Sequence, residues 1–165
     1  MEYKNIFSFG VEWNYRTVGM FVLLLILPNL LGMLNVTTPF GFNIHFFQFA
    51  IFVAAVVFGP LGGLMSGLFG SAYSAVLMHN PSIIVGNMIL GFLAGMFFRY
   101  GWHAVVAALL AFAVQLLWLV PTDLYLMHMP LNVVGMLVVA LLISNVIWAT
   151  LANYAAMPLR KVLRC

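Results

Sequence analysis

The chain has 165 residues, of which 65% are hydrophobic and 5% are charged, and its formal net charge at pH 7 is +3. Soluble domains carry roughly a quarter charged residues and under half apolar ones. This composition therefore excludes a water-soluble globular protein and indicates an integral membrane protein. A spanning helix needs about 20 mostly apolar residues, so the chain has room for roughly six spans and for no second domain.

The first segment, residues 1–16, mixes acidic, basic and aromatic residues. It lacks the basic start and the small-residue cleavage site of a removable signal peptide. We expect it to stay on the mature protein as an interfacial segment. The single cysteine, Cys165, is the last residue, so no disulfide within the chain is expected.

Apolar runs separated by turn-forming residues follow this segment. The Gly59-Pro60 pair predicts a tight reversal, because proline cannot continue a helix smoothly. Ser82 is placed to cap the helix that follows it. We therefore predict an all-α bundle of six transmembrane helices over residues 17–157 and a basic tail over residues 158–165. The six runs cover residues 17–34, 45–58, 61–78, 83–98, 104–120 and 131–154.

The basic residues predict the orientation of the bundle. With six spans, all of them fall on one face, and Lys and Arg near span ends are retained in the cytoplasm. Both termini are therefore predicted to be cytoplasmic, in a multi-pass protein of a prokaryotic cell membrane. The same placement makes the positive charge a sign of topology and of weak attraction to anionic lipid, not of nucleic-acid binding. The basic residues are Lys4, Arg16, Arg99, Arg160, Lys161 and Arg164.

Small residues recur at every fourth position in two of the runs. Gly59, Gly63 and Gly67 form one such row, and Gly91 and Gly95 repeat the spacing in the next run. Close approach through small residues contributes much of the association between helices in lipid. The first row therefore predicts close helix contact, either inside the bundle, which is the commoner use, or with a partner protein.

Two segments resemble the substrate-binding S components of energy-coupling factor (ECF) transporters. They are VFGPLGGLMSGLFG at 57–70 and NMILGFLAG at 87–95. The resemblance implies an uptake subunit for a vitamin or a metal ion that binds its substrate near the outer surface. It also implies docking onto a transmembrane T component with two ATPase subunits, as in an ABC-type importer. The first run lacks the Ala-x-x-x-Ala pattern often used for docking in that family, which leaves Gly59, Gly63 and Gly67 as the candidate docking face.

Polar and aromatic residues gather near the predicted outer ends of the spans. Their convergence from several loops predicts a substrate site, although a single His or Asn at an interface is more often simply solvated. Asn87 is a sharper case, since an amide inside an apolar span needs a partner on another helix or on a ligand. The candidate residues are Asn43, His45, Gln48, His79, Asn80, Asn87, Trp118, Asp123, Tyr125, His128 and Asn132.

The charge of the predicted outer face constrains the ligand. That face has no Lys or Arg, and its only acid is Asp123. Aromatic faces beside a carboxylate suit a flat neutral or cationic heterocycle, and thiamine or its pyrimidine precursor is the first candidate. The alternative is a divalent metal such as nickel or cobalt, held by His45, His79, His128 and Asp123. The chain lacks the N-terminal histidine motif of the nickel and cobalt members of the family.

Catalytic motifs are absent from the sequence. It has no glycine-rich phosphate loop with its lysine, no HExxH pair and no cysteine close to a histidine, so we expect neither enzymatic activity nor a cofactor. A second hypothesis is a structural scaffold of similar six-helix shape, such as the small cell-elongation membrane proteins. A scaffold needs no ligand pocket, and the outer polar residues favour the binding protein.

Overall fold

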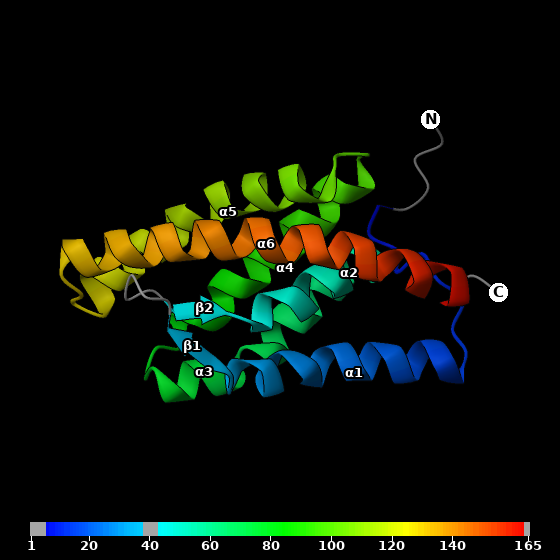
Figure 1. Ribbon diagram of the computed structural model, residues 1–165, viewed down its shortest axis with the longest axis horizontal. Coiled ribbons are helices and arrows are strands. Elements are labelled where there is room, and N and C mark those ends of the chain that lie inside the picture. Colours follow the sequence, from blue (N-terminus) through cyan, green and yellow to red (C-terminus); the bar gives the residue numbers. More distant parts are fainter. Residues whose placement is uncertain (1–5, 38–42, 164–165) are drawn as a thin grey trace.

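The structure is a computed structural model that describes residues 6–37 and 43–163, except for the side chains of residues 35–37, 43 and 44. It is a helical bundle (Figure 1). The elements are α1 (Tyr15–Gly32), β1 (Asn35–Thr37), β2 (Asn43–His45), α2 (Phe47–Gly70), α3 (Ala72–Leu77), α4 (Ser82–Arg99), α5 (Ala104–Pro121), the π-helical turn η1 (Thr122–Leu126) and α6 (Leu131–Leu163).

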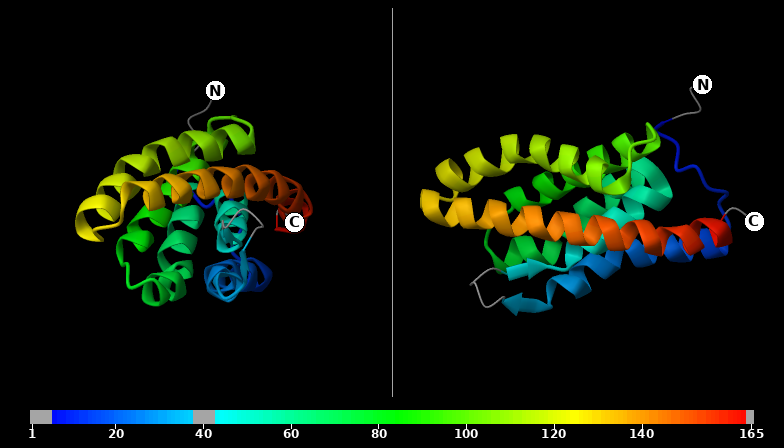
Figure 2. Two further views of the ribbon diagram at one scale, coloured as in Figure 1. Left: turned by 60° about the vertical axis from the view of Figure 1, so that its left-hand side comes forward. Right: turned by 45° about the horizontal axis from the view of Figure 1, so that its top comes forward.

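The bundle has two distinct ends. The start of α1 and the end of α6 lie together at one end, called here the terminal end, and the β1–β2 hairpin, α3 and η1 lie at the other, called the loop end (Figure 1). In both views of Figure 2, α1 and α5 lie on opposite sides with α2 between them. The two strands pair antiparallel, with Asn35 opposite His45.

In the described part of the chain, five stretches of helix are long and apolar enough to cross a membrane, which is the architecture of a multi-pass membrane protein. Large apolar side chains on the outer faces of α1, α5 and α6 are exposed, as lipid contact requires. The runs expected at 45–58 and 61–78 both fall within one of these stretches. The stretches are Tyr15–Gly32, Phe47–Leu77, Ser82–Arg99, Ala104–Leu126 and Leu131–Leu163.

The α2 segment is a hairpin of two helical halves and not a straight rod. Gly59 has non-helical angles, with φ 75° and ψ −160°. A Cβ atom built on Gly63 would lie 3.0 Å from the Cβ atom of Ala55, eight residues earlier, whereas eight residues of straight helix rise about 12 Å. The chain therefore reverses at Gly59, as the Gly59-Pro60 pair predicts. The first half is the centre of the bundle, because every residue from Ala50 to Phe58 is buried.

Two arginines hold this reversal at the terminal end. Arg160 donates to the carbonyl of Val56, and its guanidinium lies 4.6 Å from the centre of the Phe98 ring. The guanidinium of Arg99 lies within 3.0 Å of the position that a Cβ atom on Gly59 would take. The last carbonyls of a helix lack partners within it and carry partial negative charge. Cationic donors therefore stabilise the end of the first half of α2.

The predicted glycine row packs against α4. A Cβ atom on Gly63 would overlap the carbonyl of Gly91, and one on Gly95 would lie 2.7 Å from the carbonyl carbon of Gly59. Gly59, Gly63 and Gly67 are all buried. The prediction of close helix contact is confirmed for the interior of the bundle. The assignment of this row as a partner-docking face is wrong, because α4 occupies it.

The two ends of the chain differ from the sequence prediction. Asn14 caps α1, and its Oδ1 atom accepts hydrogen bonds of 3.0 Å from the backbone N–H groups of Arg16 and Thr17, so the helix begins at Tyr15. The basic tail predicted from residue 158 is helical, because α6 continues through Pro158 to Leu163. The contact of Arg160 with Val56 and the burial of Leu163 hold this last part against the bundle.

Candidate functional site

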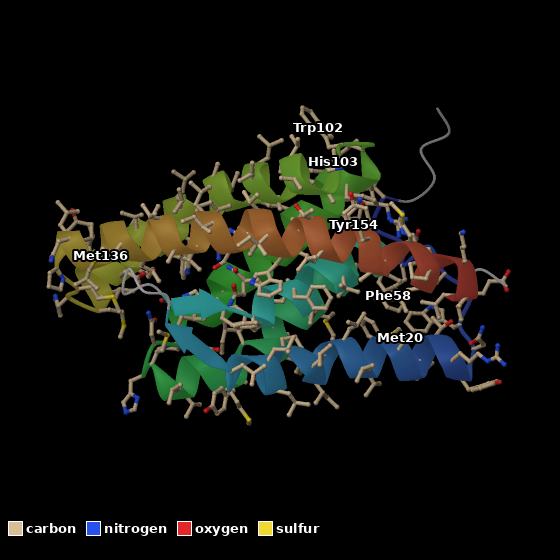
Figure 3. All side chains as sticks on the ribbon, in the orientation of Figure 1. Met20, Phe58, Trp102, His103, Met136 and Tyr154 are labelled. Carbon is tan, nitrogen blue, oxygen red and sulfur yellow. The ribbon has the colours of Figure 1, made fainter. Side chains whose placement is uncertain are left out.

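A cavity of about 110 Å³ lies at the loop end of the bundle, between β2, α3, α4, α5, η1 and α6. Figure 3 marks that end by Met136 of α6, while Phe58 and Tyr154 lie toward the terminal end. Much of the wall is apolar, with Phe46 and Phe47 at the start of α2. The polar side chains of the wall are His45, Ser74, Asn80, Ser82, Asn87, Gln115, Trp118, Thr122 and Asp123.

One face of the fifth span supplies a stripe of the wall. The spacing of its members follows i, i+3, i+4, i+7 and i+8, which places them on one side of a helix. The stripe runs on into η1, where a π-helical turn begins at Thr122; such turns are frequent at functional sites. The stripe residues are Gln115, Trp118, Leu119, Thr122 and Asp123.

A hydrogen bond between Asp123 of η1 and Asn80, which precedes α4, connects the start of α4 to the turn that follows α5. The Asp123 side chain is 3% exposed, and its Oδ1 atom accepts a 3.0 Å hydrogen bond from Nδ2 of Asn80. Oδ1 of Asn80 in turn accepts from the backbone N–H of Ser82 at 3.0 Å. The cap residue of α4 is therefore Pro81, and Ser82, predicted as the cap, is the first residue of the helix, whose N–H is paired by Asn80. Trp118 adds a third connection, because its Nε1 atom donates to the carbonyl of Ser82 at 3.1 Å.

The carboxylate of Asp123 is the only acidic group among the described residues of the wall, and no described Lys or Arg lines it. A buried charge is costly unless it is paired and hydrogen-bonded. A single amide donor is weak compensation for a carboxylate with two oxygens. The cavity is thus suited to a donor-rich or cationic group on a ligand.

His45 lies at the end of β2 and also lines the cavity. Burial lowers its pKa from the ordinary value of a histidine, because the charged imidazolium loses hydration. The ring meets Phe47 edge-on, with the ring centres 5.6 Å apart. His45 is therefore neutral at physiological pH and adds no positive charge to the cavity.

Asn87 has the helix partner that the sequence left open. Its Nδ2 atom donates to Oγ of Ser71 at 2.8 Å, and Oγ of Ser71 donates to the carbonyl of Gly67 at 2.7 Å. The amide therefore joins α4 to the end of α2, and Asn87 also lines the cavity. Its first role is helix packing.

Several predicted site residues lie away from the cavity. Gln48 is fully buried in α2 but is not part of the described wall, and for Asn43 only the backbone of β2 is described. His79 and His128 have positive φ angles of 52° and 51°, and both residues are exposed. The exposed residues are His79, Tyr125, His128 and Asn132.

The proposed metal ligands do not converge. Of the four, only His45 and Asp123 line the cavity. Among the described residues, no three His, Cys, Asp or Glu side chains gather closely enough to hold an ion. The described residues therefore do not supply enough ligands for a divalent metal ion, since structural zinc needs about four ligands and catalytic zinc about three.

Sequence reasoning missed Gln115. Its side chain is 3% exposed and lines the cavity, and its Oε1 atom has no hydrogen-bond partner among the described residues. The signal was present, because Gln115 is an amide in the middle of the apolar run 104–120, as Asn87 is in its own run. It is not among the predicted site residues, because those were placed near the loops.

No family model, curated protein or solved structure matches the chain. The function is therefore argued from the cavity and from the distribution of charge over the bundle.

Proposed function

We propose that the protein is the high-affinity substrate-binding S component of an ECF-type ABC importer in a prokaryotic cell membrane. Its substrate is a small vitamin-like molecule, a neutral or cationic heterocycle. The observation that carries the proposal is a partly polar cavity with a buried carboxylate at the end of the bundle opposite the described basic residues. The protein binds and hands over its substrate, and no chemical step is assigned to it.

The proposed topology has six membrane-crossing segments, with the two halves of α2 counted separately and both termini in the cytoplasm. Positive residues near span ends favour the cytoplasmic side, and the described ones lie at the terminal end. The loop end, with the cavity, then faces outside, where an uptake protein meets its substrate. The described basic residues are Arg16, Arg99, Arg160 and Lys161.

The volume of the cavity limits the size of the ligand. Engineered cavities of about 150 Å³ bind benzene, and pockets for drug-sized ligands measure about 300–1,000 Å³. At about 110 Å³, this cavity is smaller than either, so it has room for no more than a single ring. The pyrimidine precursor of thiamine therefore fits the cavity better than thiamine itself, which has two rings.

The proposed partners are a transmembrane T component and two ATPase subunits. The glycine row cannot be their docking surface, because α4 covers it. A scaffold protein is the competing class of function. It gains nothing from a cavity with a buried carboxylate, since both cost stability when nothing fills them.

Thermal-shift measurements on the purified protein test the proposal. We expect thiamine or its aminopyrimidine precursor to raise Tm by mass action, with no effect of EDTA. Asp123→Asn and Trp118→Ala should weaken this shift, while Tyr125→Ala, which alters an exposed side chain on the same turn, should keep it. A shift given only by Ni²⁺ or Co²⁺ and abolished by EDTA would support metal uptake. The absence of any ligand response would support the scaffold.

A further inference from the structure

Gln115 stands apart from the other polar residues of the cavity wall. Among the described residues that line the cavity, it alone has a fully buried side-chain polar atom, Oε1, without a hydrogen-bond partner. Buried polar groups in folded proteins are nearly always hydrogen-bonded, and each exception calls for an explanation. A bound ligand is one, because Gln115 is a residue of the cavity wall.

The neighbouring polar groups already have partners within the protein. Nδ2 of Asn87 donates to Ser71, Nε1 of Trp118 donates to Ser82, and Oγ1 of Thr122 donates to the carbonyl of Trp118 at 2.9 Å. These bonds fix the shape of the wall. Gln115 has a carbonyl oxygen and two N–H donors on one amide, and its Oε1 atom has no such partner among the described residues.

The space beside Gln115 depends on a glycine of α4. A Cβ atom on Gly86 would lie 3.3 Å from Nε2 of Gln115 and 3.6 Å from Cδ1 of Trp118. The amide therefore packs over the bare backbone of Gly86, next to the Trp118 indole. This arrangement restricts the amide on one side.

Gln115 and Asp123 lie on the same wall of the cavity, at different depths in the bundle. They are eight residues apart on the stripe, which corresponds to about 12 Å along a helix axis. A ring that lies along the wall between them can meet both side chains. The carboxylate of Asp123 accepts only, whereas the amide of Gln115 both donates and accepts.

We propose that Gln115 is a specificity-determining residue that binds an amide-like edge of the ligand, in which a donor lies next to an acceptor, such as a ring N–H next to a carbonyl or an amino group next to a ring nitrogen. Asp123 then binds a donor group, an amino or hydroxyl group, at another edge. The substrate class is an amino-substituted, single-ring nitrogen heterocycle. This inference rests on the proposed function, because it assumes that the cavity is a substrate site.

Two probe ligands of similar size distinguish the contribution of Gln115 to binding from that of Asp123. Cytosine carries an amino group and, across the ring, a neighbouring N–H and carbonyl, whereas benzylamine carries a cationic amine and an apolar ring. Both should bind the purified wild-type protein in titration calorimetry. Gln115→Met, which keeps the size of the side chain, should weaken cytosine binding by about tenfold or more, since two hydrogen bonds are lost. The affinity for benzylamine should stay within about twofold, which also reports that the variant is folded.

The outcomes distinguish the inference from the proposed function. If wild type binds benzylamine but not cytosine, or if Gln115→Met changes the two affinities equally, Gln115 does not read the amide-like edge and the binding function stands. If neither probe binds the wild-type protein, both proposals fail. Asp123→Asn should weaken both probes, and an undiminished affinity for both would remove the second edge of the site.

Discussion

Ser66 completes the hydrogen bonding of Leu24, a residue of another helix. Its Oγ atom donates to the carbonyl of Leu24 at 2.7 Å. In an α-helix that carbonyl would accept from the N–H four residues later, but that residue is Pro28, which has no N–H. The hydroxyl on the second half of α2 thus replaces the missing donor of α1 and ties the two helices together.

Ser66→Ala should lower the free energy of unfolding by about 1–3 kcal/mol, because it leaves a buried carbonyl unpaired. Pro28→Ala restores a backbone N–H, so the loss on Ser66→Ala should shrink in that background. Thermal denaturation of the four combinations measures the coupling. Thr150→Ala is the matched control, since its Oγ1 bond to the Val146 carbonyl, 2.7 Å long, joins residues within one helix. Equal losses from Ser66→Ala in both backgrounds would contradict this account.

Gly63→Ala should prevent the protein from folding, because the added methyl group would overlap the backbone carbonyl of Gly91, which cannot move aside without separating α2 from α4. Gly135→Ala on α6 is the control, because no atom lies within 4 Å of its added Cβ position. It should be neutral or raise stability by up to about 1 kcal/mol through helix propensity. The yield of monodisperse protein and its Tm measure both. A folded Gly63→Ala variant would mean that the two helices are farther apart.

Replacing Gln48 or Asn145 by Leu should raise Tm. Both amides are 0% exposed, and none of their side-chain nitrogen or oxygen atoms has a hydrogen-bond partner among the described residues. Removing an unsatisfied buried amide should stabilise the protein by about 1 kcal/mol or more. Asn80→Leu is the contrast, since it removes bonds to Asp123 and Ser82 and should lower Tm. A large loss of stability in Gln48→Leu would show that its amide is paired in the membrane.

The stability of the protein should fall as the pH drops below about 6.5. Burial lowers the pKa of His45, so in that range the unfolded chain binds a proton that the folded protein excludes. Stability is then full above about pH 6.5 and decreases until the folded His45 is itself protonated. The drop in Tm between about pH 7.5 and 5.5 should be smaller in His45→Gln than in wild type. His79→Gln, which changes an exposed side chain, should retain the wild-type drop.

The sequence predicted the local breaks better than the site. The Gly59-Pro60 reversal and the close packing of the glycine row follow from backbone chemistry that neighbouring residues determine. Whether that row meets α4 or a partner depends on the tertiary arrangement, which the spacing does not contain. The sequence predicts His79 and His128 in the site, but both lie on the surface in turns with positive φ. The spacing of the residues does not determine how such a turn is oriented.

The depth of a residue within its span explains which residues of the cavity wall the sequence predicts. Asp123, Asn80 and Trp118 were predicted and do line the cavity. Gln115 is not predicted, because it lies about two turns from Asp123 along the fifth span. Only helical periodicity places the two residues on the same face. Counting back three to four residues at a time along that face leads from Asp123 through Leu119 to Gln115.

The hairpin form of α2 determines how far beneath the membrane surface a ligand would sit. Its first half, residues 47–58, rises about 18 Å, while the hydrocarbon layer is about 30 Å thick. In the proposed topology, the chain before α2 completes this crossing, because the helix itself ends about 12 Å short of the far side of the layer. Phe46 and Phe47 form part of the cavity wall where the helix ends. A molecule in the cavity would lie below the level of the lipid headgroups and would have to give up its hydration shell to enter. That requirement favours rings whose polarity is spread over several hydrogen-bonding atoms over compounds that carry a concentrated charge such as a phosphate.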